Sequence, residues 1–188
     1  MKKLVLFCLI MISHSALSTE KSNRNELKWQ MNAGINLYQF RHHEYINDPI
    51  PSYADVEVGM VFGFGVQQVN SSGQSWGTKL ELQDMEGYLL TSFRAIDYRF
   101  DISESWQLGA HIGAAHYDFR TAAFGYTAGL GLFYQPDTWN NWGLSVEAQY
   151  FDKIARDKLH PDDPNDPNSG PDSFIDIQNI TLSITYSF

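Results

Sequence analysis

The last ten residues of the chain, 179–188, alternate without a break between polar and apolar side chains. Successive side chains of a β-strand point to opposite faces, so this alternation predicts a strand with one apolar and one polar face. A tilted strand that crosses the hydrocarbon layer of a membrane takes about 9–11 residues, which matches this length. The apolar face carries Ile180, Leu182, Ile184, Tyr186 and Phe188.

The same period-two pattern recurs in seven earlier segments of the chain. Polar or proline-containing stretches separate these segments, and all seven prolines fall between them, where a missing amide donor does not harm a sheet. No helical stretch of useful length interrupts the series. Eight consecutive strands joined by turns predict an all-β, eight-stranded antiparallel up-and-down barrel. The seven earlier segments are residues 27–38, 56–67, 76–84, 88–100, 106–115, 126–134 and 142–151.

The fourth segment, 88–100, does not have one clear register, because neither set of alternate residues is wholly apolar. An arginine that faces lipid near the middle of a membrane costs about 2–4 kcal/mol. We therefore place Arg94 on the inward face. A β-bulge nearby is then expected, since an extra residue lets Tyr98 face outward.

Alternation alone does not say whether the apolar faces point outward into lipid or inward, as in a soluble lipocalin-type barrel. Tryptophans lie at or near the starts of strands one, three, five and seven, which share one end of an up-and-down barrel. Amphipathic aromatic rings at one level are typical of a membrane interface, so we predict a transmembrane β-barrel. The predicted periplasmic girdle is Trp29, Trp76, Trp106, Trp139, Trp142, Tyr186 and Phe188. A second girdle is predicted at the opposite end from Tyr38, Tyr88, Tyr117, Tyr126, Tyr150 and Phe174.

The predicted inward face is polar, rich in glycine and charged with both signs. An eight-stranded barrel is narrow enough for its side chains to fill it, so we expect these charges to pair with one another. The alternative functions for such charges are a gated ion path and a catalytic carboxylate pair. The predicted interior charges are Lys28, Glu57, Lys79, Glu81, Arg94 and Glu147.

Composition and the N-terminus bear on location and partners. A basic start, a short apolar run and a small-residue cleavage pattern predict a signal peptide at residues 1–18, which leaves 19–188 as the barrel domain. The formal net charge is −9, and removing Lys2 and Lys3 makes it −11. This acidity argues against nucleic acid as a partner. Cys8, the only cysteine, lies in the predicted signal peptide, so no thiol chemistry is expected.

Residues 88–188 resemble the OmpX/Ail-type adhesion and invasion barrels, within the outer membrane protein A-like transmembrane barrel superfamily. The resemblance is carried by the Tyr98-Arg99-Phe100 strand end, the strand with two glycines at 109 and 113, the Ala-Gly-Leu strand at 128–130 and the terminal Phe188. It implies a bacterial outer-membrane protein that is not an enzyme, with loops acting in adhesion, complement resistance or envelope integrity. It also implies contact with outer-membrane lipid and lipopolysaccharide, and recognition of the closing strand by the barrel assembly machinery.

In that family strands can project as a binding edge. Two outer connections look short here, around residues 85–87 and 120–123, so strands that project far above the membrane are not expected. A monomer is expected, with a possible ligand on a host or environmental surface.

Two polar loops carry side chains of the types that bind metal ions. His42, His43 and Glu44 are adjacent on extended backbone, where neighbouring side chains diverge, so a solvated loop is expected. The long loop at 152–173 offers carboxylates but lacks the spacing of a known calcium loop, so solvation, with divalent ions bridging to lipopolysaccharide, is expected instead of a specific site. No catalytic residue, cofactor or metal is predicted. The exposed acidic residues of this loop are Asp157, Asp162, Asp163, Asp166 and Asp172.

The predicted function is surface adhesion or envelope integrity through exposed acidic loops. One alternative is a lipid A-modifying hydrolase, since some small outer-membrane barrels carry a lipid-facing histidine and serine. The segment His116-Tyr117-Asp118 has no serine two positions on, and no serine-histidine-acid spacing emerges. That activity would remove acyl chains from lipid A in expressing cells. A second alternative, a minor porin, would require ion conductance in planar bilayers.

Overall fold

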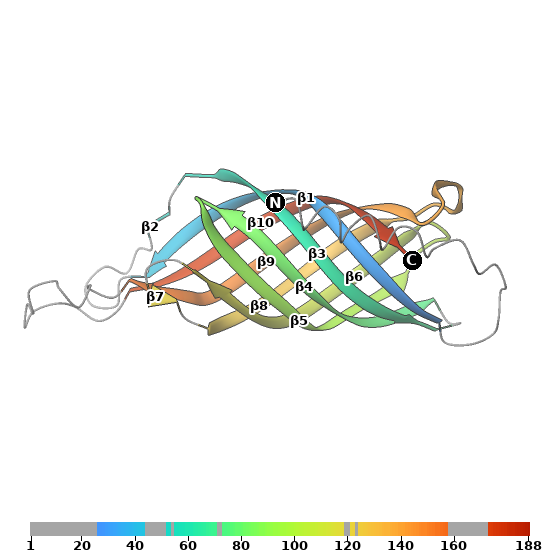
Figure 1. Ribbon diagram of the computed structural model, residues 1–188, viewed down its shortest axis with the longest axis horizontal. Coiled ribbons are helices and arrows are strands. Elements are labelled where there is room, and N and C mark those ends of the chain that lie inside the picture. Colours follow the sequence, from blue (N-terminus) through green and yellow to red (C-terminus); the bar gives the residue numbers. More distant parts are fainter. Residues whose placement is uncertain are drawn as a thin grey trace, which may run out of the picture.

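Eight long strands follow one another along the chain in the computed structural model and close into a barrel (Figure 1). The structure describes residues 26–43, 52–53, 55–70, 73–118, 121–122, 124–157 and 173–188. Two short strands, β2 (Ser52–Tyr53) and β7 (Thr121–Ala122), and one short 3-10 helix, η1 (Asp137–Trp139), lie between the long ones. The long strands are β1 (Glu26–His43), β3 (Glu57–Val69), β4 (Gln74–Met85), β5 (Tyr88–Asp101), β6 (Trp106–Tyr117), β8 (Phe124–Tyr134), β9 (Trp142–Asp157) and β10 (Ser173–Ser187).

Each long strand pairs antiparallel with its neighbours in the chain, and β10 returns to pair with β1. At this seam Trp29 and Phe188 exchange two backbone hydrogen bonds of 3.0 and 2.9 Å. Paired residues followed once around the barrel lead from Leu27 to Leu37, a shift of ten residues (37 − 27) along β1. Closure with such a stagger removes every free sheet edge from the wall. The predicted eight-stranded up-and-down barrel is confirmed.

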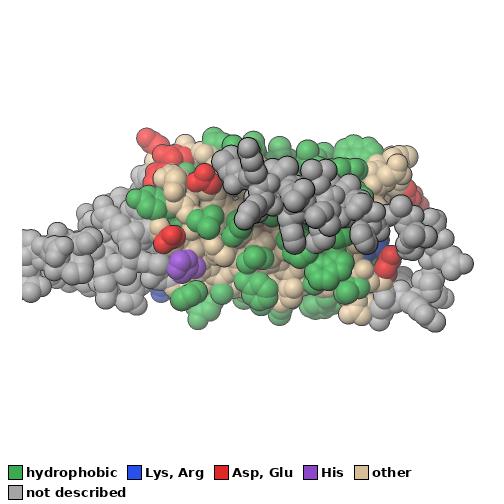
Figure 2. Space-filling view, viewed as in Figure 1, with side chains coloured by type: hydrophobic (Ala, Val, Ile, Leu, Met, Phe, Trp, Pro, Cys, Tyr) green, Lys and Arg blue, Asp and Glu red, His purple; other side chains and the backbone are tan. Residues whose placement is uncertain are grey.

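The outer wall is apolar and the interior is polar. On β10, Leu182 is 50% exposed while its neighbours Thr181 and Ser183 are 0% and 1% exposed, and the other long strands alternate in the same sense. Hydrophobic side chains are spread along the visible wall between the two ends in Figure 2, and the charged side chains seen there lie toward the ends. A soluble barrel would bury the apolar face instead. This wall is therefore built to contact lipid.

The fourth long strand, β5, contains the predicted bulge. Its pairing with β6 shifts between Arg94 and Ile96, so that Ala95 is the extra residue. Arg94 consequently lies inside and fully buried, whereas Tyr98 lies on the outer face beside Trp76, at a ring distance of 4.3 Å. The bulge keeps charged side chains out of the lipid-facing wall on both sides of residue 95.

The two ends of the barrel differ. We call the end that holds residue 26, the C-terminus and the β3–β4, β5–β6 and β8–β9 connections the tryptophan end, and the other the loop end. At the loop end, β4 and β5 are joined by a two-residue turn in which Glu86 and Gly87 have φ angles of 52° and 79°, as a tight hairpin requires.

Strands on one side of the loop end project beyond the rest of the barrel. β1 continues five residues past its last pair with β3 (43 − 38), and β9 continues five past its last pair with β8 (157 − 152). β10 pairs with both extensions, so β9, β10 and β1 form the centre of a projecting sheet, with the short strands β7 and β2 paired at its two edges (Figure 1). The expectation that strands do not project holds at the β4–β5 turn. It is wrong for β9, β10 and β1, because the residues next to the long polar connections continue the strands although the sequence pattern predicts loop there.

Across the ranges that the structure describes, no helix has both the length and the apolar character needed to span a membrane.

The filled barrel interior and the loop end as candidate functional sites

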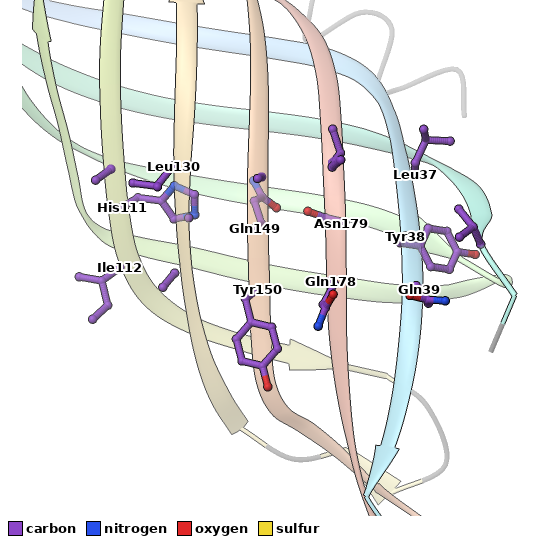
Figure 3. A pocket seen from close by; sticks show the side chains of 16 residues that line it. Leu37, Tyr38, Gln39, His111, Ile112, Leu130, Gln149, Tyr150, Gln178 and Asn179 are labelled. Carbon is purple, nitrogen blue, oxygen red and sulfur yellow. The ribbon is translucent and has the colours of Figure 1, made fainter. Parts of the chain in front are cut away.

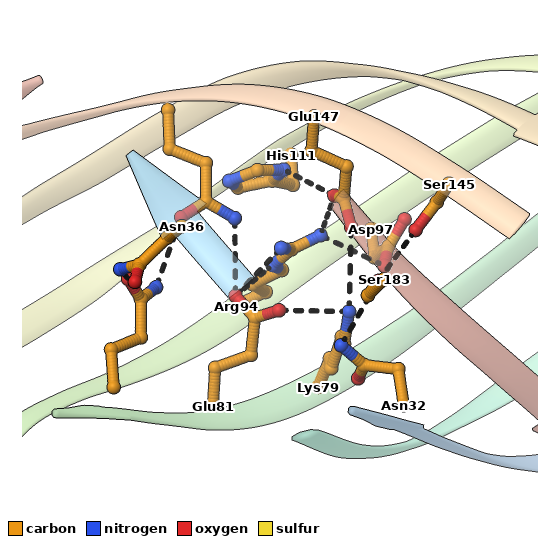
Figure 4. A network of polar contacts seen from close by, with 12 residues as sticks. Asn32, Asn36, Lys79, Glu81, Arg94, Asp97, His111, Ser145, Glu147 and Ser183 are labelled. Atoms are coloured by element: carbon orange, nitrogen blue, oxygen red, sulfur yellow. Dashed lines mark hydrogen bonds and ion pairs between the residues drawn. The ribbon is translucent and has the colours of Figure 1, made fainter. Parts of the chain in front are cut away.

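Four charged side chains meet at the centre of the barrel (Figure 4). Arg94, from β5, donates from Nη2 to Glu81 Oε2 at 2.6 Å and from Nη1 to Glu147 Oε2 at 2.5 Å. Lys79 Nζ lies 2.8 Å from Glu81 Oε1 and 3.6 Å from Glu147 Oε1. All four side chains are nearly or fully buried. Two cations thus bridge two carboxylates that would otherwise repel one another in a water-poor space.

Three further residues extend this network, and the sequence had not marked them as a group. Asp97 lies 3.7 Å from Arg94 and accepts from Arg99 at 3.1 Å, and the Arg99 guanidinium lies 3.8 Å from the Phe133 ring centre. His111 Nδ1 lies 3.9 Å from Glu147. Asp97 and Arg99 face inward because the bulge shifts the register of β5. Applying the register shift of the predicted bulge to the rest of β5 would have placed both side chains inside the barrel.

The buried network balances its charges. Lys79, Arg94 and Arg99 oppose Glu81, Glu147 and Asp97, three of each sign. Each of the two central glutamates is held by both Lys79 and Arg94, so neither is placed to take or give a proton to a substrate. The arrangement supports charge pairing within a filled barrel in preference to a catalytic carboxylate pair.

The remaining two predicted interior charges lie at the rims. Lys28 faces inward at the tryptophan end, where its side chain is 41% exposed and pairs with Glu26 at 3.7 Å. Glu57 is exposed at the loop end and accepts a hydrogen bond of 3.1 Å from the Tyr38 hydroxyl. Neither reaches the central network, because each stands at the end of its strand.

Glycines make room for the large interior side chains. A Cβ atom at Gly63 would lie 2.9 Å from Lys79 Cε, and one at Gly129 would collide with the imidazole of His111. Such contacts are closer than packed atoms tolerate, so the glycine-rich inner face is a packing requirement. It leaves no space for a wide pore at this level.

Above the charges, toward the loop end, the interior changes from polar to apolar. An amide layer comes first, in which Gln83 Oε1 accepts from Asn36 at 2.7 Å and from Asn179 at 2.8 Å. Beyond it lies an apolar cluster, each member at most 5% exposed, that we call the apolar plug. The plug comprises Tyr38, Phe40, Met85, Leu90, Ala115, Tyr117, Phe151, Ile154, Ile175 and Ile177.

Two tyrosines of the plug correct the predicted outer girdle. Tyr38 and Tyr117 point inward, at 2% and 1% exposure, instead of outward to an interface. Tyr38 accepts from the Glu86 amide at 3.0 Å, and Tyr117 donates to the Met85 carbonyl at 3.1 Å. These two hydrogen bonds therefore hold the β4–β5 turn over the opening of the barrel at the loop end. Paired apolar neighbours at strand ends, such as Leu89-Leu90, were the sequence signal for this plug.

The predicted aromatic residues of the tryptophan end are linked by ring contacts, most of them between adjacent strands. Trp106 packs on Tyr134, which contacts Trp139 edge-on, and Trp142 packs on Tyr186 at 4.9 Å between ring centres. Trp29 stacks on Phe64, Trp76 packs on Tyr98, and Phe188 stacks on Tyr186. All seven predicted residues thus lie at one end of the barrel. That this end faces the periplasm stays a prediction.

The predicted loop sites lie mostly beyond what the structure describes. Asp157 is the last residue of β9, and Asp162, Asp163, Asp166 and Asp172 fall outside the described residues, as do Glu44 and the signal peptide at 1–18. His42 and His43 end β1. Within the described ranges, no group of three or more histidine, cysteine, aspartate or glutamate side chains could hold a metal ion.

The histidines of β6 lie on opposite faces. His111 points inward, whereas His116 lies on the outer wall with its ring 5.1 Å from that of Phe124. Its backbone partner on β5 is Thr91, and Phe124 is its partner on β8. No acidic partner for His116 is seen in the described part of the chain, so this contact reads as packing at the edge of the lipid-facing wall.

The comparisons with known proteins agree on the fold. No protein-family model matches the chain. No curated protein matches it either. The crystal structure of Ail, the attachment invasion locus protein of Yersinia pestis, is similar at a TM-score of 0.50 and 15% identity, over 87% of this chain and 99% of Ail. Ail in complex with the heparin analogue sucrose octasulfate gives a TM-score of 0.51 and 14% identity, over the same shares. Neisserial surface protein A is similar at a TM-score of 0.46 and 12% identity, over 86% of this chain and 97% of that protein.

The predicted resemblance to Ail-type barrels is thus confirmed as a shared fold. A closed antiparallel barrel with an apolar belt and an aromatic ring is the architecture of bacterial outer-membrane proteins. On these grounds the chain is assigned to the bacterial outer membrane.

Proposed function

We propose that the protein is a non-enzymatic outer-membrane barrel that holds an acidic loop away from the membrane for contact with a host or environmental surface. The projecting sheet of β9, β10 and β1 carries this proposal. Asp157, at the tip of β9, pairs with Ser173, at the start of β10. The connection 158–172 therefore starts and ends at the furthest point of the projecting sheet.

The chemistry of the connection indicates the type of surface. Residues 158–172 carry four aspartates and one lysine. The exposed carboxylates of Glu57, Asp84, Glu86 and Asp118 add negative charge at the loop end. Ail binds a heparin analogue, which is a polyanion. The acidic loop end here favours a cationic surface instead, since like charges oppose contact.

The rest of the molecule serves as the support for this loop. The balanced charges and the apolar plug fill the barrel, so the proposal includes no conducting pore. We also propose a monomer that is inserted by the barrel assembly machinery through β10, whose apolar face ends in Phe188, with the loop end facing the cell exterior.

Removing the acidic connection should abolish surface binding and leave the barrel intact. Because Asp157 and Ser173 are paired neighbours, residues 158–172 can be replaced by Asn-Gly, the preferred two-residue hairpin turn. We expect cells that express this variant to lose most of their retention on cultured epithelial cells and on polylysine. Gel mobility with and without boiling should still show a folded barrel.

A charge-neutral loop separates charge from length. A variant with Asp162, Asp163, Asp166 and Asp172 all changed to asparagine keeps the connection and removes its carboxylates. Retention on polylysine should fall to the level of the deletion. If both variants bind both surfaces as well as the parent, the long loop is not the contact. Leakage of a periplasmic enzyme from cells that express the deletion would point to an envelope role instead.

A further inference from the structure

A groove of 860 Å³ runs across the outer wall of the barrel over five neighbouring strands (Figure 3). Each strand contributes two outward residues on either side of an inward one, as in Ala148-Gln149-Tyr150 on β9 and Gln178-Asn179-Ile180 on β10. A cavity inside the barrel would show the opposite order. The groove therefore lies on the lipid-facing side of β6, β8, β9, β10 and β1.

Small side chains make the groove. Ala110, Ala128 and Ala148 are outward-facing residues of three adjacent strands, and the larger side chains of Ile112 and Leu130, 54% and 65% exposed, lie beside them. Elsewhere in the wall, paired outward positions are filled by large side chains, such as Phe64, Leu80 and Phe93. One side of the barrel is therefore hollowed where the other is bulky.

The end of the groove nearer the loop end is polar. Gln178 is exposed there, its backbone partners on the two neighbouring strands are Tyr150 and Gln39, and all three line the groove. Leu37 and Ile180 line the other side of the groove at this end, and the far end, on β6, is lined by Ala110 and Ile112. An occupant thus meets hydrocarbon over most of its length and amide or hydroxyl groups at one end.

We propose that this groove holds an acyl chain of one lipopolysaccharide molecule, with Gln178 beside the amide and ester groups of its lipid A headgroup. The groove lies in the apolar wall, so its contents must be largely hydrocarbon. A second copy of the chain fits poorly, because a symmetric dimer would face one hollow with the same hollow and leave both unfilled. The choice of lipopolysaccharide rests on the proposed orientation, which puts the polar end of the groove in the outer leaflet.

Filling the groove tests the proposal. Ala148→Trp places a large side chain in the hollow, and Ala33→Trp places the same side chain on the outer wall outside the groove. Each protein is extracted from outer membranes in mild detergent, and its bound lipid A and phospholipid are measured per barrel by mass spectrometry. We expect the parent and Ala33→Trp to retain lipopolysaccharide and Ala148→Trp to retain about tenfold less.

Further variants keep the test decisive. Ala128→Leu fills the groove with a smaller side chain if Ala148→Trp does not fold, and it should show a loss of the same sign. Gln178→Leu should lower the ratio of lipopolysaccharide to phospholipid. Equal lipopolysaccharide on the parent and both groove variants, phospholipid alone on the parent, or a parent dimer that Ala148→Trp dissociates would each overturn the proposal. The 158–172 deletion leaves the groove intact, so its binding result is independent of this one.

Discussion

Replacing Arg94 with leucine is expected to lower the free energy of unfolding by about 3–5 kcal/mol, the cost of breaking a buried ion network from one side. Arg94 is fully buried and contacts both Glu81 and Glu147. Without it, Lys79 alone would have to neutralise two carboxylates in the centre of the barrel. The measurement is a urea titration in phospholipid vesicles, followed by tryptophan fluorescence.

Two comparison variants separate loss of charge balance from loss of packing. Arg94→Leu combined with Glu147→Leu leaves the Lys79–Glu81 and Asp97–Arg99 pairs neutral, so it should recover most of the lost stability. Lys28→Leu removes a half-exposed rim charge and should cost no more than about 1 kcal/mol. If Arg94→Leu costs no more than Lys28→Leu, the central charges are hydrated and the interior is not the dry, filled centre described above.

Placing an arginine at Leu182 is expected to cost about 2–4 kcal/mol, because that side chain would meet the middle of the hydrocarbon layer. Leu182 is outward on β10, with Val146 and Ile35 as its paired neighbours. Gln68→Arg is the matched control. It is also outward, but it pairs with Trp76 at the level of the aromatic ring, where the expected cost is about 0–1 kcal/mol. The same urea titration compares the two, and equal costs at both positions would place the wall outside a membrane.

The strands and the faces of their side chains were predictable because, in a barrel wall one sheet thick, the side chains of every strand alternate between the lipid and the interior. This alternation placed Lys79, Glu81 and Glu147 inside the barrel, and the cost of an arginine in lipid placed Arg94 there with a bulge beside it. The contact between Arg94 and Glu147 was not predictable in detail. It joins β5 to β9 across the barrel, and only the closed structure brings those strands together.

The apolar plug and the projecting sheet were missed for a related reason. The sequence places Tyr38 and Tyr117 at an interface because tyrosines near strand ends usually lie there, yet the local register turns both inward. Phe40 and Ile175 lie inside on strand extensions that looked like loop, since the polar residues around them obscured the alternation. The alternation of polar and apolar residues is weakest at the strand ends, and these strand ends form the loop end of the barrel.

The most direct test of the lipid-facing wall is a cysteine scan of residues 179–184 with a nitroxide spin label, in protein reconstituted into vesicles. The chain's only cysteine is Cys8, in the predicted signal peptide, so each label reports one site. Collision rates with oxygen, which concentrates in hydrocarbon, and with a water-soluble nickel complex are compared at each position. Labels at positions 180, 182 and 184 should meet oxygen freely and nickel rarely, while those at 179, 181 and 183 should be shielded from both. High nickel accessibility at positions 180, 182 and 184, or no two-residue period, would contradict a barrel whose apolar face meets lipid.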